Sequence, residues 1–339
     1  MPATQAQQPL QRGLSLVELM VALAIGLVIV AGALAVQQRC SAALRTLETV
    51  ARLQEVARLA LDVLETDVRM ANYWGLHNHA EYVVNRGEPA AALPAPFTAT
   101  QGVRIDLCGG SGSRWAIRLD EYLGGSNDGY GLACPAVGTA SPASDTLVVR
   151  RAADVPPATL AANRIHLQTT RTTGALFVAT SGCTSPRNAA CLPPAFDPAA
   201  SQSRELVVHA YYVSTGGSLR PGLPALRRKS FGNVDAAAAS DAISDEELAP
   251  GVEDLQVRLG IDTSHDGNVD EYVDPGAVPA GAAVVSATLW LRVRSEEREP
   301  GHVDRTAYRY GSMTADWVPN DDYRRIVVAK TVQVRNARP

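Results

Sequence analysis

The sequence has 339 residues, of which 46% are hydrophobic, with 31 basic and 35 acidic side chains and a formal net charge of −4. This length and apolar content are sufficient for one large domain or two small ones. The charges are nearly balanced and the arginines are scattered, whereas a nucleic-acid-binding protein would show a clustered basic surface. We therefore expect a folded protein with no nucleic-acid partner.

The most informative stretch lies near the N-terminus, where residues 14–36 form an apolar run that contains a single charged side chain, Glu18. A helix of this length crosses a bilayer with about 30 Å of hydrocarbon. A carboxylate inside such a span is unfavourable by about 3 kcal/mol on insertion scales, so it indicates a partner or a function. Glu18 is thus the first candidate functional residue.

Two ordinary explanations of this run are a secretory signal peptide and a plain signal anchor. A signal peptide would have a basic region ending at Arg12, and small residues between Ala31 and Ala35 would supply its cleavage site. Glu18 within the apolar core argues against that explanation. Neither explanation accounts for a glycine, Gly13, placed directly between Arg12 and the apolar run.

Arg12 and Gly13, followed by Leu-Ser-Leu-Val-Glu-Leu-Met-Val at residues 14–21, resemble the type IV prepilin signature. The resemblance implies that prepilin peptidase cuts between Gly13 and Leu14 and that Leu14 is then N-methylated. Leu14 stands where phenylalanine or methionine is commoner in the family. The resemblance also implies that Glu18 assists assembly by meeting the N-terminal amine of a neighbouring subunit.

The apolar run continues into an amphipathic pattern, with no glycine or proline from Ala33 to Asn72. Apolar residues recur every three or four positions, and pairs such as Glu65 and Arg69 place opposite charges four residues apart. The pattern predicts that the helix continues to about Met70. Residues 52–75 are similar to the helix that follows the anchor in the PilW family of type IV pilus minor pilins.

Five cysteines indicate an oxidising compartment. Cys108 and Cys134 flank a glycine-rich stretch, and Cys183 and Cys191 flank a short loop, so two local disulfides are the simplest pairing, although four cysteines allow three connectivities. Zinc is the alternative, but no Cys-x-x-Cys pair is present. The fifth, Cys40, is left over at the end of the apolar run.

The sequence pattern of the rest of the chain predicts strands separated by turns. We expect strands at residues 145–151, 174–180, 205–213, 252–261, 284–293 and 323–334, and short β-like pieces at 103–107 and 115–119. With one long helix before them, these runs predict an α+β fold in which a transmembrane first half of the helix leads to an amphipathic second half. That second half would pack on a mostly antiparallel β-sheet head with disulfide-bonded loops.

The predicted organisation is a leader at residues 1–13, a transmembrane or filament-core helix at 14–36, its amphipathic continuation at 37–74 and an extracytoplasmic head at 75–339. Segments 144–152, 223–228 and 323–336 of the head are also similar to the PilW family.

An Asp- and Gly-rich segment beginning at residue 262 has the front half of an EF-hand-type calcium loop, with oxygen-bearing side chains at alternate positions. The candidate calcium ligands are Asp262, Ser264, Asp266 and either Asp270 or Glu271. Position 12 of such a loop is Val273 instead of glutamate, and the flanks read as strands, so an ordinary hairpin turn is the alternative. No cofactor is otherwise required.

Motifs for catalysis are missing, since the sequence contains neither Gly-x-Ser-x-Gly nor His-Glu-x-x-His. His166, His209 and His302 are isolated in sequence. We therefore predict that the protein is not an enzyme.

The resemblance implies a minor pilin that takes part in pilus assembly or priming, or in a tip complex. Its partners would be other minor pilins, the major pilin and prepilin peptidase. It would be a single-pass inner-membrane protein with a periplasmic head, and later part of the cell-surface pilus. The alternatives are a pseudopilin of a type II secretion system, which shares the leader, and a pilus-tip adhesin that binds through the disulfide-bonded loops.

Overall fold

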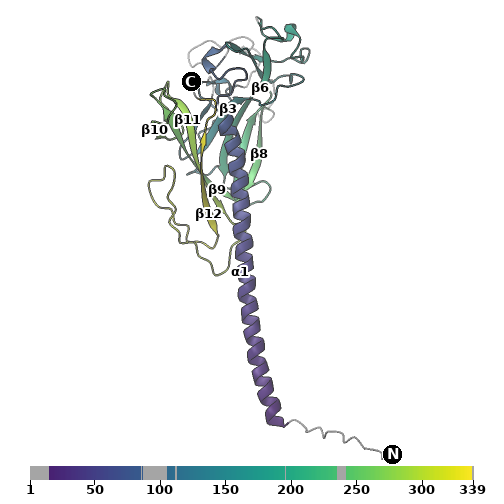
Figure 1. Ribbon diagram of the computed structural model, residues 1–339, viewed down its shortest axis with the longest axis vertical. Coiled ribbons are helices and arrows are strands. Elements are labelled where there is room, and N and C mark those ends of the chain that lie inside the picture. The colour runs from purple at the N-terminus through teal and green to yellow at the C-terminus, as the bar shows by residue number, and fades with distance from the viewer. Residues whose placement is uncertain are drawn as a thin grey trace, which may run out of the picture. The chain divides into compact units, whose positions relative to one another are not determined.

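The computed structural model describes residues 15–84, 86, 105–110, 113–194, 196–234 and 242–337. The chain divides into two compact units, Met1–Ala51 and Arg52–Pro339, and the helix α1 (Leu16–Met70) crosses the boundary between them. The second unit is called the head below. Its further elements (Figure 1) are η1 (Ala80–Tyr82), β1 (Val83–Val84), η3 (Trp115–Ile117), β2 (Leu123–Ser126), β3 (Thr146–Ala152), β4 (Ile165–Thr169), β5 (Gly174–Val178), η4 (Ala189–Cys191), β6 (Gln202–Ser214), β7 (Ala225–Phe231), β8 (Ile243–Pro250), β9 (Val252–Asp262), β10 (Glu271–Val273), β11 (Ala283–Arg294) and β12 (Arg325–Gln333).

Helix α1 has the length that the sequence predicts. Within the head it buries one apolar stripe, because its apolar side chains recur at the spacing of one helix face. The helix ends where Asn72 adopts the left-handed conformation, with φ of 60°, as a residue just beyond a helix C-terminus often does. The buried apolar residues of the stripe are Leu53, Ala57, Ala60, Leu61, Leu64 and Val68.

Two sheets form the rest of the described head. The larger has the order β1-β5-β4-β6-β3-β2, with β7 pairing both β6 and β8, and the smaller has the order β10-β9-β11-β12. Every strand pair in the described residues is antiparallel except the short pair of β1 with β5. The fold is therefore α+β with mostly antiparallel sheets, as predicted.

The two sheets are joined by a seam of buried polar groups. The backbone N–H of Asp145 donates to the carbonyl of Leu255 at 2.8 Å, and the Asp145 carboxylate accepts from the backbone N–H groups of Val257 at 2.7 Å and Asp128 at 2.8 Å. Asp145 is fully buried. Because these bonds link the start of β3 to the middle of β9, the two sheets share one core.

The six strands predicted at residues 145–334 are all present, with ends that differ by a few residues. The β-like piece predicted at residues 115–119 is wrong, because Trp115–Ile117 forms a 3-10 helix. The buried guanidinium of Arg150 donates a hydrogen bond to the carbonyl of Trp115 at 2.8 Å. This contact between distant residues cannot be predicted from the local sequence pattern. Residues 105–107 of the other predicted piece lie in a turn, and residues 103 and 104 are outside the described part of the chain.

Candidate functional site

The first turn of α1 holds Glu18, the predicted assembly residue. Its carboxylate accepts hydrogen bonds from the backbone N–H of Ser15 at 3.0 Å and from the Ser15 hydroxyl at 3.1 Å. The backbone N–H of Glu18 donates to the Ser15 hydroxyl oxygen at 3.2 Å, which completes a reciprocal capping box. The predicted processing residues, Gly13 and Leu14, lie outside the described residues.

The helix beyond Glu18 is apolar on all sides. Leu16, Leu27 and Val28 are each at least 70% exposed, and one window of this helix is long and apolar enough to cross a membrane. A helix that is apolar all round needs lipid or other apolar helices around it. Glu18 therefore lies in an exposed apolar segment with the length and composition of a membrane span.

A second carboxylate, Asp67, lies at the other end of α1 within the head. It accepts hydrogen bonds from Arg151 Nε at 3.0 Å and Nη2 at 2.9 Å, and from His209 and Tyr211. Only 3% of Asp67 is exposed. We name these four residues the helix clamp, because they tie α1 to strands β3 and β6.

The electrostatics of the clamp favour an ionised Asp67. Burial raises the pKa of this carboxyl, but the hydrogen bond and charge of His209, the charge of Arg151 and the hydroxyl of Tyr211 outweigh it and hold the pKa well below its usual range. The helix clamp was not predicted from the sequence. His209 is isolated in the sequence, but in the fold it is hydrogen-bonded to Asp67. The available signal was the position of Asp67 next to Val68, within the apolar stripe.

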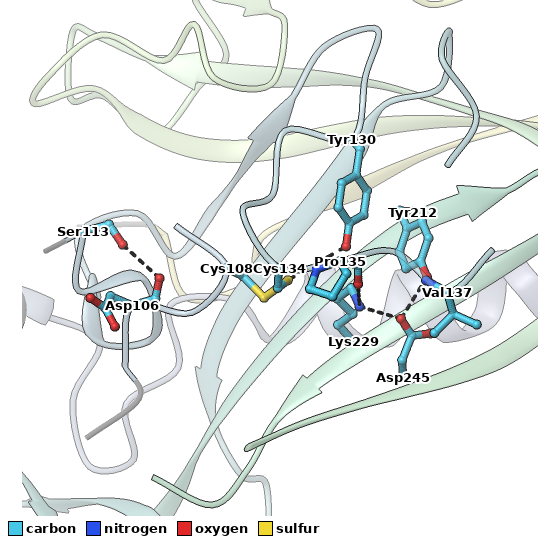
Figure 2. Close-up of a disulfide and its surroundings, with 10 residues drawn as sticks. All are labelled: Asp106, Cys108, Ser113, Tyr130, Cys134, Pro135, Val137, Tyr212, Lys229 and Asp245. Carbon is cyan, nitrogen blue, oxygen red and sulfur yellow. Dashed lines mark hydrogen bonds and ion pairs between the residues drawn. A yellow bond between two sulfur atoms is a disulfide. The ribbon is translucent and has the colours of Figure 1, made fainter. Parts of the chain in front are cut away.

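The disulfide between Cys108 and Cys134 is present in the structure, in loop segments that precede β3 (Figure 2). Beside it, the buried ammonium of Lys229 donates to the carboxylate of Asp245 at 2.6 Å, and the Tyr212 hydroxyl donates to the same oxygen at 2.8 Å. Lys229 also donates to a backbone carbonyl at position 135, at 2.8 Å, so the segment after Cys134 is held against β7.

The second disulfide, between Cys183 and Cys191, closes the loop after β5. A small separate core of Leu160, Phe177, Ala179 and Leu192 lies beside this loop. Cys40 is a free, exposed cysteine on α1. The two local pairings are therefore those that the sequence favoured.

The Asp- and Gly-rich turn follows β9. The Asp262 carboxylate accepts backbone N–H groups of His265 at 2.6 Å and Gly267 at 2.7 Å, while Asp270 accepts from the backbone of Thr263 at 2.8 Å and Ser264 at 2.9 Å. Hydrogen bonds from Thr263 and Ser264 lower the pKa of Asp270 to about 2. The carboxylates thus organise the turn itself.

Asp266 accepts a backbone N–H at 2.8 Å within the same turn, and Glu271 begins β10. Among the described residues, no group of three or more His, Cys, Asp or Glu side chains is arranged to hold a metal ion. Calcium binding by Asp262, Ser264, Asp266 and Asp270 or Glu271 stays a prediction.

Two family models match the chain. Residues 9–34 match the prokaryotic N-terminal methylation motif, and residues 210–336 match the family described as type IV pilus-assembly protein W, or PilW. The chain thus has the N-terminal motif of type IV pilin-like proteins and a C-terminal region that matches the PilW family. Neither the comparison with curated proteins nor that with solved structures found a match.

The two matches locate the pilin features on the fold. The methylation motif includes Gly13, Leu14 and Glu18, and the PilW match runs from the middle of β6 through β12. The matches indicate a protein of pilus assembly, and the apolar helix that carries the methylation motif is long enough to cross a membrane.

Proposed function

We propose that this pilin-like protein is a minor pilin of the type IV pilus, of the PilW type. Prepilin peptidase would cut it between Gly13 and Leu14, and Leu14 would be methylated. The helix would hold it in the inner membrane as a single-pass protein with a periplasmic head, until it joins the pilus. In this proposal residues 1–13 are the leader, 14–36 the membrane and filament-core helix, 37–74 its continuation and 75–339 the head.

The observation that carries the proposal is Glu18, the single charged residue in the apolar run of residues 14–36. A carboxylate in an apolar environment is stabilised by a cation at close range. Cleavage before Leu14 creates such a cation, the new N-terminal amine, near the same depth. Pairing of Glu18 with the amine of a neighbouring subunit would fix the axial register of the two apolar helices.

The minor pilin would act by packing and charge pairing, without catalytic turnover. Lateral contacts between apolar helices would place it beside other minor pilins and the major pilin, in a priming or tip complex. A type II secretion pseudopilin shares the N-terminal motif, but the PilW-family match over residues 210–336 favours the pilus. The disulfide-bonded loops support an adhesin role at the tip as a second candidate function.

The decisive experiment combines mass spectrometry of the mature N-terminus with piliation of Glu18 variants. The mature chain should begin with methylated Leu14. Glu18→Gln keeps a side chain that can accept the Ser15 hydrogen bonds but removes the charge, whereas Glu18→Ala removes both. If charge pairing drives assembly, both variants should lose piliation, and Glu48→Ala, an exposed acid of the same helix, should not.

Normal piliation of the Glu18→Gln strain would contradict the charge-pairing mechanism and would leave helix capping as the role of Glu18. A mature chain that begins after Ala33 or Ala35 would contradict the pilin proposal altogether. The adhesin role has its own test: shortening the loop between Cys183 and Cys191 should reduce adherence while pili are still made.

A further inference from the structure

The connection between β11 and β12, residues 295–324, is unusually long for one without named strands or helices. Connections longer than about 12–15 residues without such elements are uncommon in compact domains and usually have a function. The roles proposed above for the apolar helix and the disulfide-bonded loops do not involve this connection.

The connection is folded back on itself as an irregular hairpin. The backbone N–H of Tyr308 donates to the carbonyl of Trp317 at 2.9 Å, and the N–H of Trp317 returns a bond of 3.0 Å to Tyr308. Nearer the sheet, the backbone N–H of Asp304 donates to the carbonyl of Asp321 at 2.7 Å, and the Asp304 carbonyl accepts from the N–H of Asn320 at 3.0 Å. Both pairs share one register, so residues 303–321 form a single two-stranded unit, which we call the arm.

Side chains clamp the arm to the smaller sheet. The Trp317 ring packs against two guanidinium groups, with that of Arg292 at 3.8 Å and that of Arg325 at 5.2 Å from its centroid. The Tyr310 hydroxyl donates to Asp254 on β9 at 2.7 Å. Arg325 is 1% exposed at its side chain, so the arm is anchored on buried groups of the smaller sheet.

The outward side of the arm differs from the clamped side. Residues 303, 305, 307 and 309 are all exposed, with Val303 at 50%, while Asp304 and Tyr308 between them are buried. Val318 on the returning strand is 39% exposed. Arg305 and Arg309 have no hydrogen bond or ion pair within the described part of the chain.

The exposed charges of this side without an ion pair are two arginines and one acid, Asp316, which the register places opposite Arg309. Asp322, which the same register places opposite Val303, is paired with Arg298 at 3.5 Å. The outward side therefore combines small apolar side chains with net positive charge, on a protein whose overall charge is −4. A surface of this kind is complementary to an acidic face with apolar residues among its charges.

The arm lies at one end of the head. Lys330 on β12 pairs with Glu65 of α1, and the backbone N–H of Arg335 donates to the carbonyl of Arg69, so β12 runs toward the C-terminal end of the helix. The start of β12 is therefore at the other end, nearer Arg52, and the arm leaves from there. Figure 1 shows this connection on the side of β11 and β12 away from the C-terminus.

We propose that the outward side of the arm, formed by Val303, Arg305, Ala307, Arg309 and Val318, is a docking surface for an acidic face of another pilus subunit. This inference rests on the proposed minor-pilin function. Because Trp317 and Tyr310 already anchor the arm to the smaller sheet, docking immobilises few further groups. A modest contact surface is then sufficient for specific binding. The arginines would steer the partner and set the orientation in which it docks.

Photo-crosslinking in piliated cells tests the proposal with the full chain. A photoreactive phenylalanine analogue replaces Val303, and the same analogue at the exposed Val155 serves as the control position. Crosslinked products from sheared pili are identified by peptide mass spectrometry. The analogue is then combined with Arg305→Glu and Arg309→Glu, with the matching lysine substitutions, or with Arg171→Glu, an exposed arginine elsewhere on the head.

The expected result is an adduct at position 303, but not at 155, with an acidic peptide of a pilus subunit. Charge reversal of both arginines should lower its yield about tenfold, while the lysine and Arg171→Glu variants keep it. An adduct with lipid, or one unaffected by charge reversal, overturns the docking surface.

The failure of this inference is distinguishable from that of the proposed function. A chain that is present in sheared pili but gives no adduct at position 303 overturns the docking surface alone. A chain that is absent from the pili overturns both.

Discussion

Replacing Asp67 with asparagine should release the clamp that ties α1 to the head. The carboxylate receives two hydrogen bonds from Arg151 and one each from His209 and Tyr211, and its side chain is 5% exposed. An amide keeps one acceptor oxygen and turns an N–H₂ group toward donors. The Arg151 charge would then be buried without a counterion.

Removal of one partner from a buried ion pair destabilises a protein by about 3–5 kcal/mol. The matched control is Asp62→Asn on the exposed side of the same helix, where the partner Arg58 is 3.9 Å away and the carboxylate is 57% exposed. Exposed pairs contribute about 0–1 kcal/mol, so this control should leave the free energy of unfolding nearly unchanged.

Urea unfolding of the full chain in detergent micelles, followed by tryptophan fluorescence, measures the difference, and Trp74 is a fully buried reporter close to the end of α1. The pH dependence has a definite sign. Since the pKa of Asp67 is lower in the folded chain than in the unfolded chain, its contribution is complete above the ordinary carboxyl pKa and is lost as the pH falls below it. If Asp67→Asn costs less than about 1 kcal/mol at pH 7, the clamp does not hold the helix.

Three further predictions concern the head. Cys108→Ser with Cys134→Ser should lower the free energy of unfolding by roughly 3–4 kcal/mol, from a loop separation of 26 residues, and Cys40→Ser should not change it, as measured by urea unfolding under oxidising conditions. Burial raises the pKa of Asp145 to about 7, so the folded chain holds this proton more tightly than the unfolded chain; stability should fall as the pH rises from about 4 to about 7, and Asp145→Asn should flatten that slope in thermal unfolding. Calorimetric titration with millimolar calcium should give a weak binding heat that Asp262→Asn abolishes, and the absence of heat from the unaltered chain would refute the calcium site.

The elements predicted from sequence are those whose pattern is local. The strands at residues 205–213 and 284–293 are rich in β-branched and aromatic residues, and α1 repeats its apolar stripe for many turns. Strands β7 and β8 were not predicted, because their sequences are charged. Their ladder pairs Arg227 and Lys229 with Asp245 across the two strands, at 2.7 and 2.6 Å, and such pairing is visible only in the folded chain.

The candidate functional residues also fall into those that the sequence identifies and those that only the fold brings together. The motif around Glu18 is contiguous, so the sequence is sufficient to single it out, whereas the helix clamp joins Asp67 to residues more than 80 positions away. The arm was not predicted either, because Trp317 and its two arginines come from three separate segments. Contacts between distant segments depend on the register of the sheets, which no single pattern specifies.

The two carboxylates of α1 have opposite relations to their surroundings, and this explains why Glu18 is the one suited to act between subunits. Asp67 is surrounded by donors from its own chain, so a neighbouring molecule has nothing to add. Glu18 has only Ser15 as a hydrogen-bond partner within the described residues, and no cation. An anion with few partners in an apolar segment gains most from a cation that arrives on another helix. The carboxylate without a cation therefore favours association, while the paired one holds the helix to the head.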